Sequence, residues 1–260
     1  MSLLLRFLVF IAFGVVLALF GSRQHPQPQS LQPAPFLQQP TSLQRVQVRS
    51  GTGFFINQEY IVTNAHVVKG CDTVMIQGAV PRQQAKVQAF DVERDLAVMK
   101  TAAVQHHVTR MRFDVGSMRE GDLVFIIGYP GAEGAKGKYK FIDAMMYAHP
   151  QNMKGWFYIT DRLEHGESGG PVFDTYGNVI GIVVAKSVLK TVNRQTREVV
   201  STTPVGVVIG LNVLYGFLSD HGIKGWVSAS GYGSAYRLNE HIEEEARNFI
   251  VNVQCAVKGQ

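Results

Sequence analysis

Short apolar runs separated by Gly, Asn and Asp dominate the chain from Val46 to about residue 210. Most are rich in Val, Ile, Phe and Tyr, a composition typical of strands. Helical periodicity is weak over the same region, so the pattern predicts an all-β protein built as a barrel or a sandwich. The runs are GFFI (53–56), YIVT (60–63), TVMIQ (73–77), KVQAF (86–90), LAVMK (96–100), LVFIIG (123–128), YKFIDAMMYA (139–148), WFYIT (156–160), VIGIVVA (179–185) and VGVVI (205–209).

The N-terminal segment departs from this pattern. Residues 7–21, FLVFIAFGVVLALFG, are uncharged and apolar, and Arg6 precedes them. A helix of this length spans roughly 22 Å, short of the ~30 Å core of a bilayer, but Leu3–Leu5 lengthen the apolar run. Residues 1–21 are therefore predicted to be a transmembrane signal anchor, with a cleaved signal peptide as the alternative. The positive charge before the run places the following chain outside the cytoplasm, tethered to the membrane in the first case and secreted in the second.

A linker and a C-terminal extension are predicted on either side of the strand-rich region. Residues 22–44 are rich in Gln and Pro, which cannot form a core and favour extended conformations. Residues 222–260 begin with a Gly/Ser-rich stretch, and an amphipathic helix is predicted over Arg237–Val253. We expect this helix to pack on the body of the protein; a contact with another copy or a partner stays open. Its apolar face would comprise Leu238, Ile242, Ala246, Phe249, Ile250 and Val253.

Composition and charge exclude several classes of function. The net charge is +5, but the 25 Lys and Arg residues are scattered, so a nucleic-acid surface is not predicted. The two cysteines, Cys71 and Cys255, have no metal-ligand spacing, and neither a metal site nor a cofactor is expected. The sequence leaves open whether they form a disulfide, as an extracytoplasmic location would allow, or stay unpaired.

Three separate stretches carry residues suited to nucleophilic catalysis. His66 follows the predicted strand that ends at Thr63, and Asp95 stands at the head of the very apolar run LAVMK. A carboxylate buried there needs a partner, which the imidazole of His66 would supply. Ser168 lies in the stretch HGESGGP (165–171). Because Gly166 has no Cβ, it can adopt a positive φ and direct its N–H, with that of Ser168, toward a developing oxyanion.

These residues occur in the order His, Asp, Ser, which is the chymotrypsin order and not that of subtilisins or α/β-hydrolases. The stretches TNAHVV, DLAV and GESGGPV resemble the trypsin-like serine proteases, specifically the HtrA/Deg branch. The resemblance implies a protease domain over residues 45–221, made of two six-stranded β-barrels. It implies a catalytic triad of His66, Asp95 and Ser168 at their junction, and an oxyanion hole formed by Gly166 and Ser168.

The function implied is that of a serine endopeptidase, a hydrolase that cleaves protein or peptide substrates through an acyl-enzyme. An inactive protease-fold module that binds peptides is the alternative. Residues expected around the substrate are His165, Val184, Ala185, Lys186 and Gly206. Val184 favours a small apolar side chain before the cleaved bond and Lys186 an acidic one, and the sequence does not decide between them.

Two departures from the family pattern bear on these predictions. Glu167 stands before the serine, where HtrA-like proteins usually carry Asn and trypsins carry Asp. We expect Glu167 to face solvent or to pair with a nearby base, with no activation by proteolysis. HtrA proteins continue into a PDZ domain of roughly one hundred residues, whereas about forty residues follow His221.

Overall fold

The computed structural model describes residues 46–113, 118–148, 154–160, 163–228 and 237–258. The chain separates into two units, Met1–Leu43 and Gln44–Gln260, and all described residues belong to the second. The predicted anchor and nearly all of the predicted linker lie outside the described residues. No helix within the described ranges is long and apolar enough to cross a membrane.

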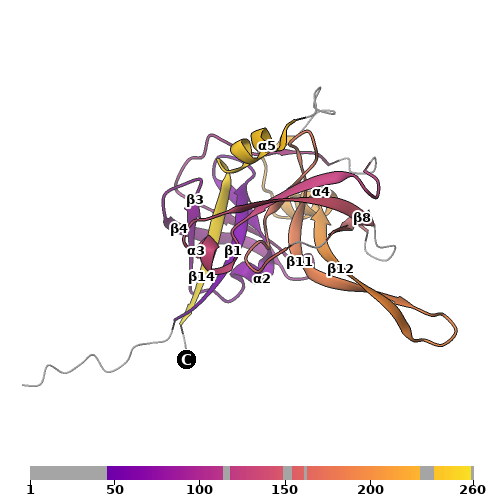
Figure 1. Cartoon of the computed structure of the whole chain (residues 1–260). Coiled ribbons are helices and arrows are strands. Elements are labelled where there is room, and N and C mark those ends of the chain that lie inside the picture. The colour runs from indigo at the N-terminus through magenta and orange to yellow at the C-terminus, as the bar shows by residue number, and fades with distance from the viewer. Residues whose placement is uncertain (1–45, 114–117, 149–153, 161–162, 229–236, 259–260) are drawn as a thin grey trace, which may run out of the picture. The chain divides into compact units, whose positions relative to one another are not determined.

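The first barrel closes through strands from both ends of the described chain (Figure 1). Its six strands pair in the order β1-β14-β3-β4-β5-β2. The short helix α2 (Ala65–Val68) connects β2 to β3. The strands are β1 (Val46–Phe55), β2 (Tyr60–Thr63), β3 (Thr73–Gly78), β4 (Gln83–Asp91), β5 (Leu96–Lys100) and β14 (Ile250–Lys258).

The second barrel is a ring of six strands in the order β10-β7-β8-β9-β12-β11, closed by the pairing of β10 with β11. Two short strands, β6 (Arg110–Met111) and β13 (Val227–Ser228), extend the sheet beyond β11. The fold is therefore all-β with two barrels, as predicted. The ring strands are β7 (Leu123–Gly128), β8 (Lys140–Ala148), β9 (Trp156–Thr160), β10 (Pro171–Phe173), β11 (Val179–Val192) and β12 (Val199–Gly210). The remaining helices are α3 (Gly131–Ala135), α4 (Leu211–Asp220) and α5 (Asn239–Ala246).

The predicted C-terminal helix is wrong in its second half. Only Asn239–Ala246 is helical, and Ile250–Lys258 forms β14, paired with β1 on one side and β3 on the other. Apolar residues at 246, 249, 250 and 253 fit a helical stripe, but β14 also buries Val251, which would lie off that stripe. Two neighbouring strands satisfy the backbone groups of β14. The end of the predicted extension is thus an integral strand of the first barrel.

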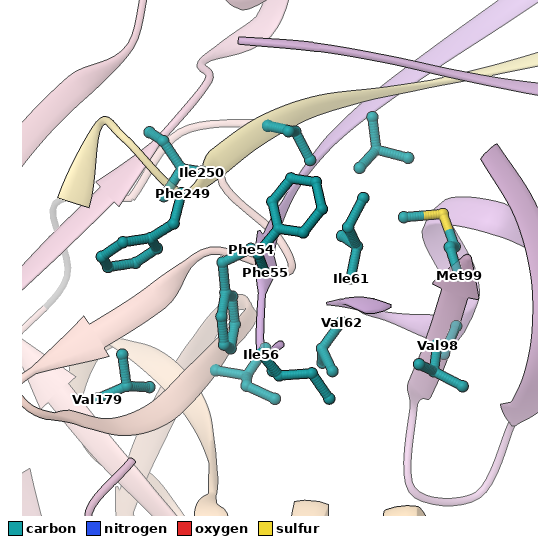
Figure 2. Close-up of a cluster of buried hydrophobic side chains, with 14 of the residues drawn as sticks. Phe54, Phe55, Ile56, Ile61, Val62, Val98, Met99, Val179, Phe249 and Ile250 are labelled. Carbon is teal, nitrogen blue, oxygen red and sulfur yellow. The ribbon is translucent and has the colours of Figure 1, made fainter. Parts of the chain in front are cut away.

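One apolar core runs through the first barrel and into the second. Figure 2 shows buried side chains of β1, β2 and β5 together with Val179 of β11 and Phe249 before β14. These two residues have 0% and 3% of their surface exposed, so they belong to the packed interior. The labelled members are Phe54, Phe55, Ile56, Ile61, Val62, Val98, Met99, Val179, Phe249 and Ile250. Because interiors pack densely, this shared core holds loops from the two barrels in a fixed relation.

Candidate active site

His66 lies on the outer side of α2 and contacts Asp95 through two hydrogen bonds. The other residues of this one-turn helix, Ala65, Val67 and Val68, are buried, which leaves the imidazole exposed. The Nδ1 atom of His66 lies 2.8 Å from Oδ2 of Asp95, and the His66 backbone N–H donates to Oδ1 at 2.9 Å. Both carboxylate oxygens therefore contact the same residue, which restricts how the ring can turn relative to its own backbone.

The turn before β5 directs Asp95 toward His66. Asp95 has a φ of 51°, a left-handed conformation that costs roughly 1–2 kcal/mol for a residue with a Cβ. The side-chain Nδ2 of Asn64 donates to the Asp95 carbonyl oxygen at 2.9 Å and secures this turn. Asn64 belongs to the motif TNAHVV, but its contact with Asp95 could not be predicted from that motif, because the contact depends on the pairing of β2 with β5.

Ser168 lies in a loop that is attached to both barrels. Its carbonyl oxygen accepts a hydrogen bond from the N–H of Thr52 in β1, at 2.8 Å. The next residue, Gly169, donates to the carbonyl oxygen of Val183 in β11, also at 2.8 Å. A Cβ at Gly169 would come within 3.2 Å of the Asn64 nitrogen, so this loop abuts the segment that leads into His66. No hydrogen bond joins the side chains of Ser168 and His66 in the part of the chain that the structure describes.

Gly166 adopts the positive φ that the sequence predicted, at 97°. The carbonyl oxygen of His165 accepts a hydrogen bond from the N–H of Gly131 at 2.6 Å. In a trans peptide the N–H of Gly166 then points the opposite way, away from Gly131. A Cβ at Gly166 would lie 2.4 Å from the carbonyl oxygen of Tyr129, so only glycine fits here without displacement of the backbone.

A hydrogen-bonded chain through Thr52 fixes the next peptide, between Gly166 and Glu167. The Thr52 hydroxyl donates to the Gly166 carbonyl oxygen at 2.7 Å and accepts from the Tyr129 N–H at 2.9 Å. Thr52 is fully buried. Within the described residues, the N–H groups of Gly166 and Ser168 donate to no protein acceptor, so both remain available to an oxyanion.

Glu167 is fully buried, so the prediction that it faces solvent is wrong, and it forms no ion pair with any base that the structure describes. Its Oε2 accepts from the N–H of Glu164 at 2.6 Å, whereas Oε1 has no hydrogen-bond partner among the described residues. Burial raises the pKa of the Glu167 carboxyl, and the hydrogen bond from the Glu164 backbone and the positive charges of Lys140 and Lys186 oppose that rise. The side chain packs against Gly128, where a Cβ would lie 3.0 Å from its Cγ. The absence of a side chain at Gly128 leaves the space that lets Glu167 turn inward.

The residues predicted to contact substrate do not all share one cavity. His165 and Lys186 line a cavity of ≈ 350 Å³ between the loop that begins α3 and the loop before Ser168. Val184 and Ala185 lie at a bulge in β11, and Ala185 is exposed. Gly206 lies opposite Lys186 in β12, but it is buried. A Cβ there would be 2.8 Å from the side chains of Ile159 and Leu163, which fill this space.

The family of trypsin-like peptidase domains matches residues 51–182, a range that includes His66, Asp95 and Ser168. This chain belongs to the trypsin-like peptidase family. The serine protease Rv3671c of Mycobacterium tuberculosis is 29% identical over 150 residues, covering 54% of this chain and 37% of that protein. A DegP-like periplasmic serine endoprotease of Halomonas elongata is 34% identical over 135 residues, covering 51% of this chain and 28% of the relative.

Two further comparisons extend over more of this trypsin-like chain. The uncharacterized protein y4bJ of Sinorhizobium fredii is 30% identical over 213 residues, covering 79% of this chain and 32% of that protein. The crystal structure of the inactive form of the Rv3671c protease superposes with a TM-score of 0.50 at 25% identity, covering 68% of this chain and 88% of that one. The chain spans between 28% and 37% of the length of these curated relatives.

Proposed function

We propose that this protein is a serine endopeptidase whose catalytic residues are His66, Asp95 and Ser168. The observation that carries the proposal is the two-point contact between His66 and Asp95, with Nδ1 2.8 Å from Oδ2. A carboxylate on Nδ1 places the ring proton on that nitrogen and leaves Nε2 free to accept another. The imidazole is thereby prepared to act as a general base.

In the proposed reaction, Ser168 Oγ attacks the carbonyl carbon of a peptide bond while His66 Nε2 takes its proton. His66 then returns the proton to the leaving amine, and water hydrolyses the acyl-enzyme by the same steps in reverse. Asp95 stays ionised and stabilises the imidazolium. The hydrogen bond between Ser168 and His66 is expected to form when substrate excludes water, because catalytic hydrogen bonds tighten in the substrate complex.

The oxyanion of the tetrahedral intermediate would be stabilised by the N–H groups of Gly166 and Ser168. Both are unpaired within the described loop. The Gly131 N–H holds the peptide that carries the Gly166 N–H, through the His165 carbonyl oxygen, and the Thr52 hydroxyl holds the next peptide, through the Gly166 carbonyl oxygen. Loss of one such donor reduces kcat by roughly 10²–10³-fold in serine proteases. This preorganised pair would supply much of the rate enhancement.

The protease domain is proposed to act outside the cytoplasm. Cys71 and Cys255 form a disulfide, and such bonds persist mainly in oxidising compartments. The DegP-like relatives are named as periplasmic proteins, which supports the same location. Residues 1–21 would anchor the chain in the membrane, and residues 22–44 would hold the domain away from the bilayer.

A fluorophosphonate probe tests this function. Such a probe reacts with an activated serine, so wild-type protein should be labelled and Ser168→Ala should not. Circular dichroism on both proteins controls for folding. A folded wild-type protein that is never labelled, yet binds peptides, would instead support the inactive peptide-binding module.

A further inference from the structure

The strands β11 and β12 run past the rest of the second barrel as a long hairpin (Figure 1). Their pairing extends from Gly181 opposite Gly210 to Val192 opposite Val199. We define the hairpin arm as residues 186–204. Almost every side chain of the arm is exposed, so the core of the second barrel does not account for its length.

One edge of the arm continues directly from the loop that carries Ser168. Along one edge, β11 pairs with β12. Along its opposite edge, β11 pairs first with β10 and then with the loop that carries Ser168. Gly169 donates to the Val183 carbonyl oxygen, and the Val183 N–H donates to Gly170. Beyond Val183 this edge has no backbone partner among the described residues. It presents a row of free N–H and C=O groups over about 30 Å, at ~3.3 Å per residue.

The side chains of the arm have a definite chemical character. The arm contains four cationic residues, Lys186, Lys190, Arg194 and Arg197, and a single acidic residue, Glu198. None of the four cations forms an ion pair within the described residues. The arm also exposes apolar side chains, with exposed fractions of 51% for Val188, 43% for Val192, 51% for Val199 and 66% for Val200.

We propose that the free edge of the hairpin arm, from Ser187 to Val192 of β11, binds an extended substrate segment that is acidic with interspersed apolar residues. The inference rests on the proposed protease function and concerns the arm beyond Lys186. A peptide that continues the line of β10 would pair antiparallel to β11. Its chain would then run toward Ser168, so the segment on the arm lies on the N-terminal side of the cleaved bond. Strand addition supplies backbone hydrogen bonds, and the cations select acidic side chains.

Two peptides with the same cleavage site test the proposal. One has about four residues before the cleaved bond, and the other about ten, the added residues alternating Asp or Glu with Val. We expect wild-type protein to cleave the long peptide with kcat/KM about tenfold higher or more, mainly through a lower KM. The gain should shrink at high salt and with Asn and Gln in place of Asp and Glu, because it depends on exposed charges.

Two variants locate the effect on the arm. The double variant Lys190→Glu/Arg194→Glu should lose the gain for the acidic peptide and cleave the short peptide normally. Its matched control is Lys86→Glu/Arg110→Glu, which makes the same change in charge at exposed residues outside the arm. Replacement of residues 189–203 by Asn-Gly would join Val188 to Pro204, which lie opposite each other, through a tight turn. This variant should also lose the gain while fluorophosphonate labelling of Ser168 persists.

Binding separates this inference from the proposed catalysis. A fluorescent long peptide should bind Ser168→Ala more tightly than it binds the same protein with the shortened arm, even if the enzyme never turns over. Equal binding, or equal kcat/KM for the two peptides, overturns the inference and leaves labelling of Ser168 unaffected. If shortening the arm abolishes binding to phosphatidylglycerol vesicles or self-association while peptide selectivity is unchanged, the arm serves a membrane or a second copy, and the inference is likewise overturned.

Discussion

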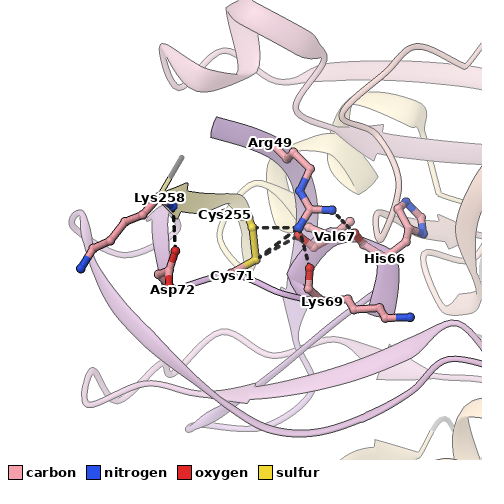
Figure 3. Close-up of a disulfide and its surroundings, with 8 residues drawn as sticks. All are labelled: Arg49, His66, Val67, Lys69, Cys71, Asp72, Cys255 and Lys258. Atoms are coloured by element: carbon pink, nitrogen blue, oxygen red, sulfur yellow. Dashed lines mark hydrogen bonds between the residues drawn. A yellow bond between two sulfur atoms is a disulfide. The ribbon is translucent and has the colours of Figure 1, made fainter. Parts of the chain in front are cut away.

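Cys71 and Cys255 form a disulfide between residues 184 apart in sequence, with their Cα atoms 5.3 Å apart (Figure 3). Cys71 follows the helix that carries His66, and Cys255 lies in β14. The guanidinium of Arg49 covers the pair, with Nη2 3.3 Å from the Cys255 sulfur and 2.5 Å from the Lys69 carbonyl oxygen. Its Nη1 lies 3.4 Å from the His66 carbonyl oxygen. The end of the His66 helix is thus attached to both β1 and β14.

Removal of the disulfide should destabilise the first barrel. Cross-linking across so long a loop restricts the unfolded chain, and loss of a native disulfide of this kind costs roughly 2–5 kcal/mol. We expect Cys71→Ser/Cys255→Ser to unfold at a lower urea concentration than wild type. Wild-type protein treated with a reductant should show the same shift. A midpoint unchanged in both would contradict a structural role for the bond.

Arg49 should act as a positioning residue for His66. In Arg49→Ala the carbonyl oxygens at the end of α2 lose their donor, so we expect kcat to fall by roughly 3–10-fold, about 1 kcal/mol, with KM little changed. Arg82→Ala is the control, because Arg82 also contacts β14, through Gln254, but not α2. Similar losses of kcat in both variants would indicate a general effect on the barrel instead.

Asp95→Asn should reduce kcat by roughly 10³–10⁴-fold, because an amide can hold the imidazole in the wrong tautomer. Steady-state kinetics on a peptide substrate measures the change, with KM expected to stay close to that of wild type. Asp91→Asn provides the comparison, since Asp91 contacts the backbone of Glu93 and Arg94 and not His66. If Asp95→Asn retained full activity, the proposed role of Asp95 would be refuted.

Glu167→Gln should change how stability depends on pH. Burial raises the pKa of Glu167, so the folded state holds the proton more tightly than the unfolded state does. The raised pKa therefore stabilises the folded wild-type protein below pH 4.5, the pKa of the carboxyl in the unfolded state. This stabilisation is lost as the pH rises through the folded pKa. Relative to wild type, Glu167→Gln should therefore gain stability between acidic and neutral pH, as measured by urea unfolding across that range.

Glu133→Gln is the control for this experiment, because the pKa of Glu133 is shifted in the opposite direction from that of Glu167. Hydrogen bonds from Lys136 and Lys138 lower the pKa of the exposed Glu133 to about 2. Its contribution is present above the unfolded pKa and is lost as the pH falls. If the wild type and Glu167→Gln showed parallel pH profiles, the assigned direction of the Glu167 shift would be wrong.

Val251→Ala distinguishes the observed strand from the predicted helix. Val251 is fully buried in β14, so truncation should cost roughly 1.5–3 kcal/mol of unfolding free energy. In the predicted helix this side chain would lie off the apolar face, and the substitution would be nearly neutral. Val48→Ala in β1, where the residue is 61% exposed, is the matched control and should change stability by less than about 0.5 kcal/mol.

The sequence alone determined the class of fold and the candidate catalytic residues, because these depend on local patterns. Runs such as YIVT and LAVMK formed the predicted strands β2 and β5. The position of Asp95 at the head of an apolar strand anticipated its contact with His66. Gly166 adopted the expected positive φ, which a glycine can take without steric cost because it has no Cβ.

Only the tertiary structure decided the role of the C-terminal residues and of Glu167. The apolar positions from 246 to 253 satisfy the periods of both a helix and a strand, and the open position between β1 and β3 selects the strand. Glu167 turns inward because Gly128, far away in sequence, leaves room for it. The Cys71–Cys255 bond likewise requires that β14 lie beside β1. Each outcome depends on which distant segments become neighbours, and local periodicity carries no information about that pairing.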